Sequence, residues 1–258
     1  SNTVIVSTED FNGYRVRQEV FPDIDAFRAK QWPMTADDFN DFGLSRESDV
    51  AKTGVEYLFD GELRGRERLI AAAFNDPLLR NGVVVYGAYL AGPHAFEKPL
   101  IVDLKEQKVP AWIRLYCLYP LDARHVVVPL TWGEYWVGSY EDKVPCKLSV
   151  YGNTTSPDPD AEGWEYLGSL NQAPERQAVA QRWSFLTTNL LLAPKDVNDL
   201  ETRDPIYVDI QFPPVNQTYR YLKILVHDTF DSSSENDINF NMEECFTLQE
   251  LEVYVKKD

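Results

Sequence analysis

Residues 131–142, TWGEYWVGSYED, gather aromatic and acidic side chains in a short stretch that could bind a flat, hydroxylated ring. A pyranose ring has an apolar face of C–H groups and a rim of hydroxyl groups. A sugar site therefore needs an aromatic platform with hydrogen-bonding side chains beside it. Here tryptophan and tyrosine would form the platform, and a nearby arginine and a glutamate would be polar partners. The candidate carbohydrate-binding residues are Trp132, Tyr135, Trp136, Tyr140, Arg124 and Glu134.

The same aromatic cluster also fits a purely structural interpretation. Large rings in a β protein more often fill the core or its rim than form the floor of a ligand site, because they bury much apolar surface. The sequence leaves three arrangements open for 131–142: a sugar platform, core packing, and a mixture in which one ring is exposed.

The composition describes an ordinary globular protein with a strong negative charge. Of its 258 residues, 44% are hydrophobic and 26% are charged, which is ample apolar material for a large β domain. The formal net charge is −16, so phosphate backbones and anionic lipid surfaces would be repelled. We therefore expect no nucleic-acid partner, whereas neutral glycans, cations and basic proteins remain open. No apolar run approaches the ~20 residues that span a bilayer, so no membrane span is expected.

The sequence lacks the motifs of the common catalytic classes. It contains no GxSxG elbow, HExxH zinc motif, P-loop or GxGxxG loop. The three histidines, His94, His125 and His227, are too scattered to indicate a metal centre. With 41 acidic residues, some carboxylates will lie close together by chance, so composition does not argue for a glycosidase pair. We therefore predict that the protein is not an enzyme.

Short runs of alternating apolar and polar residues, separated by turn-forming residues, predict an all-β protein. In IYVDIQF (206–212), for example, Ile206 and Val208 lie on one face, while Tyr207 and Asp209 lie on the other. One stretch, 66–80, has a helical pattern and is expected to form a short helix. The predicted strands cover 99–104, 111–119, 146–152, 206–212, 220–228 and 246–255.

The start of the chain differs from the rest, because residues 1–53 lack a clear order of strands. We interpret 1–53 as an N-terminal extension, or the end of a preceding domain, and 54–258 as the β-sandwich. The chain begins with Ser1 rather than Met, which suggests that a preceding signal or anchor has been removed.

The three cysteines, Cys117, Cys146 and Cys245, show no CxxC spacing. Cys117 and Cys146 lie in strand-like apolar stretches, which favours buried free thiols. A disulfide between these two is the alternative, since exported proteins permit one.

From residue 57 onward, a series of short phrases follows the order found in a known family. The phrases are YLFDG (57–61), KPLIVDL (98–104), AWIRLY (111–116), VPCKLSVYGN (144–153), WEYLG (164–168), YRYLKILV (219–226) and FTLQELEVY (246–254). In this order the chain resembles the discoidin, or coagulation-factor C-type, domain of the galactose-binding-like superfamily. The likeness is greatest to versions in exported proteins of glycan-degrading gut bacteria. The resemblance implies an antiparallel jelly-roll β-sandwich.

Many members of that family bind one structural calcium ion where the first and last strands meet. Carried over to this sequence, the matching positions are Asp60 of LFDG and Glu250 of QELEVY. Calcium prefers oxygen ligands, which carboxylates and the carbonyls of a glycine turn provide. The alternative is that Asp60 caps its own turn and Glu250 is a solvated strand residue, since several members of the superfamily bind no metal.

Together these observations predict a non-catalytic carbohydrate-binding module of an exported bacterial protein that handles glycans, at the cell surface or in the periplasm. The aromatic stretch in 131–142 would bind the glycan. The alternative is a protein-interaction or structural β-sandwich that packs beside other surface proteins, in which case the tryptophans would lie in an apolar interface.

Overall fold

A computed structural model gives the structure of the chain in ranges separated by gaps. The residues that it describes are 6–9, 15–18, 25–27, 50–51, 55–67, 84–85, 87–91, 95–117, 119, 144–172, 182–184, 194, 196–230, 244 and 246–256.

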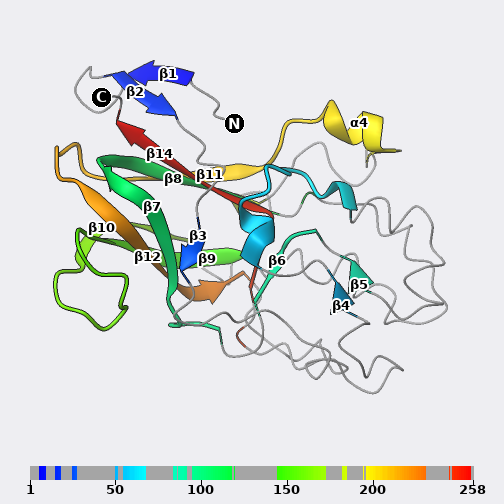
Figure 1. Cartoon of the computed structure of the whole chain (residues 1–258). Coiled ribbons are helices and arrows are strands. Elements are labelled where there is room, and N and C mark those ends of the chain that lie inside the picture. Colours follow the sequence, from blue (N-terminus) through cyan, green and yellow to red (C-terminus); the bar gives the residue numbers. More distant parts are fainter. Residues whose placement is uncertain are drawn as a thin grey trace.

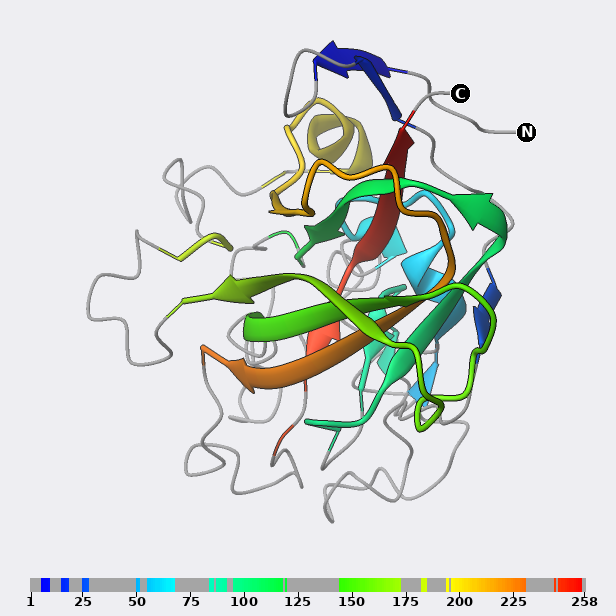
Figure 2. The ribbon, with the colours of Figure 1, turned by 90° about the vertical axis from the view of Figure 1, so that its left-hand side faces the viewer.

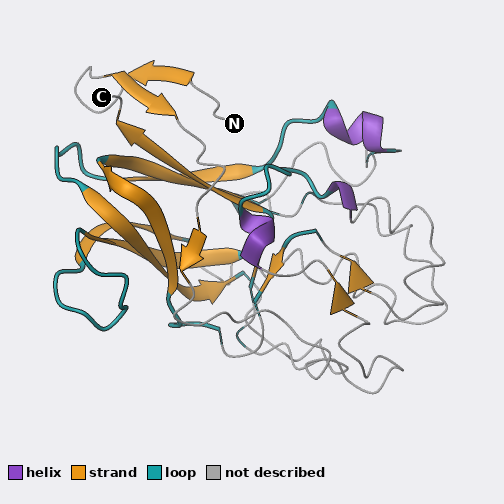
Figure 3. Cartoon of the chain, in the orientation of Figure 1, coloured by secondary structure: helices purple, strands orange, loops and turns teal. Residues whose placement is uncertain are grey.

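Two five-stranded sheets pack face to face (Figures 1 and 3). The first sheet has the order β1-β2-β14-β8-β11, with β1 at Val6–Glu9, β2 at Arg15–Gln18, β14 at Glu250–Lys256, β8 at Pro110–Tyr116 and β11 at Tyr207–Gln211. The second has the order β10-β9-β12-β7-β3, with β10 at Glu165–Asn171, β9 at Pro145–Asn153, β12 at Tyr219–Thr229, β7 at Leu100–Lys108 and β3 at Asp25–Phe27.

Every pairing within these two sheets is antiparallel. From β7 onward the chain passes repeatedly between the sheets, as β7, β9, β10 and β12 belong to one and β8, β11 and β14 to the other. The predicted all-β antiparallel jelly-roll sandwich is thus confirmed, and all six predicted strands are present.

Smaller elements complete the described chain. Two two-stranded sheets pair β13 (Thr247–Leu248) with β6 (Tyr89–Leu90), and β4 (Val50–Ala51) with β5 (Val84–Val85). A 3-10 helix, η3, spans Val55–Leu58, and α4 spans Val197–Glu201. Of the helix expected over 66–80, only its first two residues are described, and both are helical. None of the helices in the described part of the chain has the length and apolar character needed to cross a membrane.

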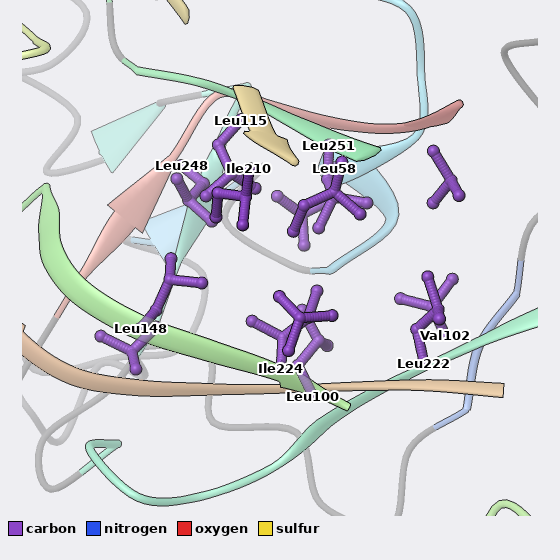
Figure 4. Close-up of a cluster of buried hydrophobic side chains, with 14 of the residues drawn as sticks. Leu58, Leu100, Val102, Leu115, Leu148, Ile210, Leu222, Ile224, Leu248 and Leu251 are labelled. Atoms are coloured by element: carbon purple, nitrogen blue, oxygen red, sulfur yellow. The ribbon is translucent and has the colours of Figure 1, made fainter. Parts of the chain in front are cut away.

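The core lies between the two sheets and is filled by alternate side chains of the facing strands (Figure 4). On β12, Leu222 and Ile224 are buried, and they point toward Leu115 of β8 and Leu251 of β14. Leu58 joins the same cluster from η3. Burying each such side chain contributes about 1.5–3 kcal/mol, which makes this layer the main source of stability.

Gly168 lets the two sheets approach closely where β10 passes β11. The register of β10 shifts between Tyr166 and Gly168, so the strand bends there. A Cβ atom at Gly168 would lie 2.7 Å from the backbone oxygen of Gln211 and 3.2 Å from the ring of Phe212. Only glycine therefore fits at this position.

The predicted strand over 246–255 is divided in two at Gln249. This side chain is fully buried, and its Nε2 donates to the backbone oxygens of Gly87, at 2.9 Å, and Glu62, at 3.3 Å. A buried amide needs such partners, and reaching them takes residue 249 out of the strand. The interruption links the last strand to the turn that follows η3.

Segments of the first 53 residues pair with both sheets. β2 pairs with the end of β14, and β3 pairs with β7. The division of the chain into 1–53 and 54–258 stays a prediction.

Cys117 and Cys146 are free and buried, which agrees with the thiol interpretation rather than the disulfide. Burial, followed by the nearby charge of Asp228, raises the pKa of the Cys146 thiol to about 12. Such a thiol is almost entirely protonated at neutral pH and is a poor nucleophile. Cys245 lies outside the described residues.

We expect neither Cys117 nor Cys146 to react with a disulfide reagent such as DTNB in native buffer, because both lie in the core and the reaction needs a thiolate. In denaturant both should react at once. The measurement is best made on a Cys245→Ser variant, so that the signal comes from these two thiols alone. Rapid reaction of either thiol in the native protein would contradict the buried arrangement.

Candidate functional site

The aromatic site predicted from the sequence lies outside the described residues. This applies to every one of its members, namely Arg124, Trp132, Glu134, Tyr135, Trp136 and Tyr140. The strands on either side are described: β8 ends at Tyr116 in the first sheet and β9 begins at Pro145 in the second. Whether the rings form a sugar platform or core packing stays a prediction.

Asp60 and Glu250, which are 190 residues apart in the sequence, come together. Gly61 has a φ of +82°, a conformation that glycine adopts readily, and the turn directs its N–H to Glu250. This N–H donates to Glu250 Oε2 at 3.1 Å. Asp60 Oδ1 accepts from the N–H of Glu62 at 2.9 Å, and the Asp60 carboxyl group lies close enough to that of Glu250 for each to shift the pKa of the other. The η3 turn and the start of β14 thus bring two carboxyl groups into contact.

The surroundings of Glu250 disfavour a negative charge. Its side chain is 1% exposed. Burial, and then the contact with Asp60, raises the pKa of Glu250 to about 11. Burial also raises the pKa of Asp60. Two carboxyl groups in contact cannot both ionise easily, so without a cation the pair retains a proton at neutral pH.

The residues around this pair fit an oxygen-binding cation such as calcium. Gln249, beside Glu250, has a buried Oε1 atom without a hydrogen-bond partner. Calcium takes roughly six to eight oxygen ligands, and carboxylate, amide and backbone oxygens all serve. Within the described part of the chain, no group of three or more His, Cys, Asp or Glu side chains is placed to hold a metal. A calcium ion at Asp60 and Glu250 would therefore need amide, backbone or water oxygens as its other ligands.

A second candidate surface lies on the outer face of the second sheet, where β10, β9 and β12 run side by side (Figure 2). Tyr166 of β10 is opposite Tyr151 of β9, which is opposite Lys223 of β12. These three side chains form the aromatic row. Tyr166 is 57% exposed, and its ring meets that of Tyr151 at 71° with 5.9 Å between centroids. The two rings therefore form an open corner.

The loop between β9 and β10 supports one end of the aromatic row. Trp164 Nε1 donates to the backbone oxygen of Asp158 at 2.8 Å, which fixes the indole against the loop. Lys223 Nζ donates to the oxygen of Pro159 at 3.0 Å, and it lies 4.7 Å from the Trp164 ring and 5.2 Å from the Tyr151 ring. These contacts with two rings are cation–π interactions. Burial lowers the pKa of Lys223.

Next to the aromatic row, on the same face, lies a polar row formed by Ser169, Ser149 and His227. Tyr166 donates its hydroxyl to Ser169 Oγ at 2.9 Å, or accepts from it. Ser149 Oγ lies 2.8 Å from His227 Nε2, and His227 Nδ1 is hydrogen-bonded to Glu97. The polar row therefore presents hydroxyl and imidazole groups beside the exposed ring of Tyr166 and the half-buried ring of Tyr151.

The order Ser149, His227, Glu97 resembles a catalytic triad, but the strand that carries the serine argues against catalysis. A triad needs N–H donors for the oxyanion that forms during acyl transfer. β9 lies between β10 and β12, and Ser149 is paired with Ser169 on one side and Leu225 on the other. The ladders on both sides engage the backbone of β9, so in the described strands no N–H beside Ser149 is free for an oxyanion.

Sequence reasoning missed this outer face. Tyr166 belongs to the phrase WEYLG, and Tyr151 to VPCKLSVYGN, and neither phrase was interpreted as part of a binding site. Alternation does place these tyrosines on the outer face, but the register that sets them opposite one another joins strands distant in sequence.

Several solved structures are similar to this chain at low sequence identity. No family model matches the chain, and no curated protein matches it. A family 32 carbohydrate-binding module of a family 31 glycoside hydrolase from Clostridium perfringens is similar with a TM-score of 0.42 and 11% identity, over 91% of this chain and 96% of that one. A SusE-like protein has a TM-score of 0.44 and 14% identity, over 90% of this chain and 95% of that one.

A third similar structure is the family 32 carbohydrate-binding module of NanJ from C. perfringens, solved with galactose. Its TM-score is 0.38 and its identity 8%, over 79% of this chain and 86% of that one. Family 32 modules have the discoidin, galactose-binding-like fold that the sequence resembles. The sandwich described above rests on its own strand pairing.

Proposed function

We propose that this chain is a non-catalytic carbohydrate-binding β-sandwich of an exported protein that handles glycans at the cell surface or in the periplasm. The observation that supports this most is a rigid antiparallel sandwich whose described surface presents tyrosine rings beside hydroxyl and imidazole groups. The strongly acidic composition favours a neutral ligand over an anionic one. The one triad-like group on the described surface lacks oxyanion donors, which supports binding without catalysis.

Binding would combine stacking of a sugar ring on an aromatic side chain with a few hydrogen bonds. A shallow, wet surface buries little area, so we expect a weak affinity for each site, with a Kd of ~0.1–1 mM and a binding free energy of roughly −4 to −5.5 kcal/mol. The first ligands to test are galactose, the sugar in the NanJ structure, and N-acetylgalactosaminyl-β-1,3-galactose, the sugar in the structure of another family 32 module from C. perfringens.

The stretch 131–142 is the principal proposed sugar platform. We expect Trp132→Ala or Trp136→Ala to weaken galactose binding about tenfold, because loss of a stacked ring removes roughly 1.4 kcal/mol. Isothermal titration at millimolar sugar measures this. Tyr207→Ala is a matched control, since Tyr207 is exposed on the other sheet. Normal affinity in both tryptophan variants would favour core packing of these rings. If the unchanged protein binds no neutral saccharide, carbohydrate binding fails as its function.

We also propose that Asp60 and Glu250 hold one structural calcium ion. The ion would supply the positive charge that allows both carboxyl groups to ionise in contact with each other. Its role would be structural, because the pair joins the turn after η3 to the start of β14.

A further inference from the structure

We propose that the outer face of the second sheet is a second carbohydrate-binding site, separate from the stretch 131–142, that takes a neutral glycan across β10, β9 and β12. It consists of the aromatic row, Tyr166, Tyr151 and Lys223, and the polar row, Ser169, Ser149 and His227. The inference rests on the proposed function, because it gives that function an additional surface.

The aromatic row has the shape that a sugar ring needs. Tyr166 is 57% exposed, and its hydroxyl is hydrogen-bonded to Ser169, so the orientation of the ring is held without a ligand. The Tyr151 ring stands at 71° to it. One ring can then contact the apolar face of a pyranose while the other flanks its side. Because both tyrosines belong to paired strands, little freedom is lost when a ligand binds.

The polar row lies at the distance that a hydroxyl rim requires. Ser149 is two residues before Tyr151 on β9, which places it about 7 Å along the strand on the same face. Its hydroxyl already contacts His227, and His227 is held by Glu97. A sugar that stacks on the tyrosines thus has hydroxyl and imidazole groups at its rim, and these can both donate and accept.

The charges around this face favour a neutral ligand. The loop between β9 and β10 exposes Asp158, Asp160 and Glu162, while Lys223 is engaged by the oxygen of Pro159. Lys147, also on β9, is paired in register with Asp228. An anionic polysaccharide or a phosphorylated ligand would be repelled by the acidic loop.

The small apolar area argues for a glycan rather than a protein. The large hydrophobic side chains that the described part of the chain leaves exposed are Tyr166, Tyr207 and Val215. Tyr207 is on the first sheet, and Val215 lies in the connection between β11 and β12. Tyr166 is thus the one exposed ring of the described part of this face, with the half-buried Tyr151 ring and polar side chains beside it. A protein interface would normally need a continuous apolar centre.

The test compares five forms of the full chain: unchanged, Tyr166→Ala, Trp132→Ala/Trp136→Ala, the triple variant that combines these three substitutions, and Tyr207→Ala as the matched control. Affinity electrophoresis in soluble galactan and isothermal titration with N-acetylgalactosaminyl-β-1,3-galactose are the measurements. We expect Tyr166→Ala to weaken galactan binding at this second site about tenfold and to leave binding at the stretch 131–142 unchanged. The double tryptophan variant should keep part of its retardation in the gel. Addition of Tyr166→Ala to the double tryptophan variant should remove the remaining retardation in the galactan gel.

A second measurement uses only the unchanged protein, so it does not depend on whether a variant folds. In a heteronuclear NMR titration of the unchanged protein with the disaccharide, the amides of Ser149, Tyr166 and Ser169 should shift together. The inference is overturned if these amides do not move and Tyr166→Ala behaves like Tyr207→Ala, while the tryptophan variants lose binding. That result would leave the proposed function intact. If the unchanged protein binds no neutral saccharide, galactan and the disaccharide included, both proposals are overturned.

Discussion

Calcium is expected to raise the melting temperature of the unchanged protein by several degrees and to have no effect on a Glu250→Gln variant. A ligand present at about 100 times its Kd stabilises the folded state by about 2.7 kcal/mol. For a chain of this size, each kcal/mol corresponds to roughly 2–4 °C. The shift should therefore be about 5–10 °C, measured by thermal denaturation in calcium and in EDTA.

The pH dependence without calcium provides a second test of the Asp60–Glu250 pair. The folded-state pKa of Glu250, about 11, lies above its ordinary value of 4.5. The folded protein therefore keeps a proton that the unfolded chain releases, so this group costs stability as the pH rises from its ordinary pKa toward its folded pKa. In EDTA we expect the melting temperature to fall between mildly acidic and mildly alkaline pH. Calcium should flatten that fall.

Glu250→Gln separates the two effects. An amide resembles the protonated carboxyl group but does not titrate, so in EDTA the variant should match the unchanged protein at mildly acidic pH and exceed it at alkaline pH. An equal calcium shift in both proteins would place the ion elsewhere. If the unchanged protein shows no calcium shift, the pair acts as a proton-sharing contact that holds the η3 turn against β14.

Gly168→Ala is expected to destabilise the protein by about 1–3 kcal/mol or more, as overpacking of a close contact does. The new Cβ atom would lie 2.7 Å from the backbone oxygen of Gln211, which is fixed in β11 and cannot rotate away. The two sheets would have to separate locally, and contacts with Phe212 would be lost. Urea denaturation measures the change in the free energy of unfolding.

The matched control for Gly168→Ala is Asn171→Ala, an exposed position on the same strand. It should change the free energy of unfolding by less than about 0.5 kcal/mol. Gly61→Ala tests backbone strain instead of overpacking. No atom lies within 4 Å of a Cβ atom at this position, but the φ of Gly61 is +82°. A Gly168→Ala variant as stable as the Asn171→Ala control would contradict the close approach of β10 and β11.

The sandwich could be predicted from the sequence because a long strand with one buried face has apolar and polar residues in alternation, and this pattern is visible in the sequence. β12 is the clearest case, since Leu222, Ile224 and Val226 are buried. Alternation could not indicate β1 and β2, which have four residues each, or β3, which has three. It also missed the interruption at Gln249, because the bonds to Glu62 and Gly87 depend on contacts with distant segments.

The candidate sites also differ in how far the sequence alone could predict them. The pairing of Asp60 with Glu250 followed from the family resemblance, since no local pattern joins residues so far apart. The corner of Tyr151 and Tyr166 depends on the register of β9 and β10, and the place of Ser149 beside His227 depends on the register of β9 and β12. The stretch 131–142 was noticed for its composition alone, and its residues lie outside the described chain.

The pairing of β2 with β14 and of β3 with β7 has a consequence for any shortened form of the protein. These strands cover backbone N–H and C=O groups of two long strands rich in apolar side chains. A fragment that starts at residue 54 would leave both rows of groups unpaired, and unpaired edges of this kind recruit strands from other molecules. In the full chain, the N-terminal strands β2 and β3 would therefore protect these two edges from aggregation.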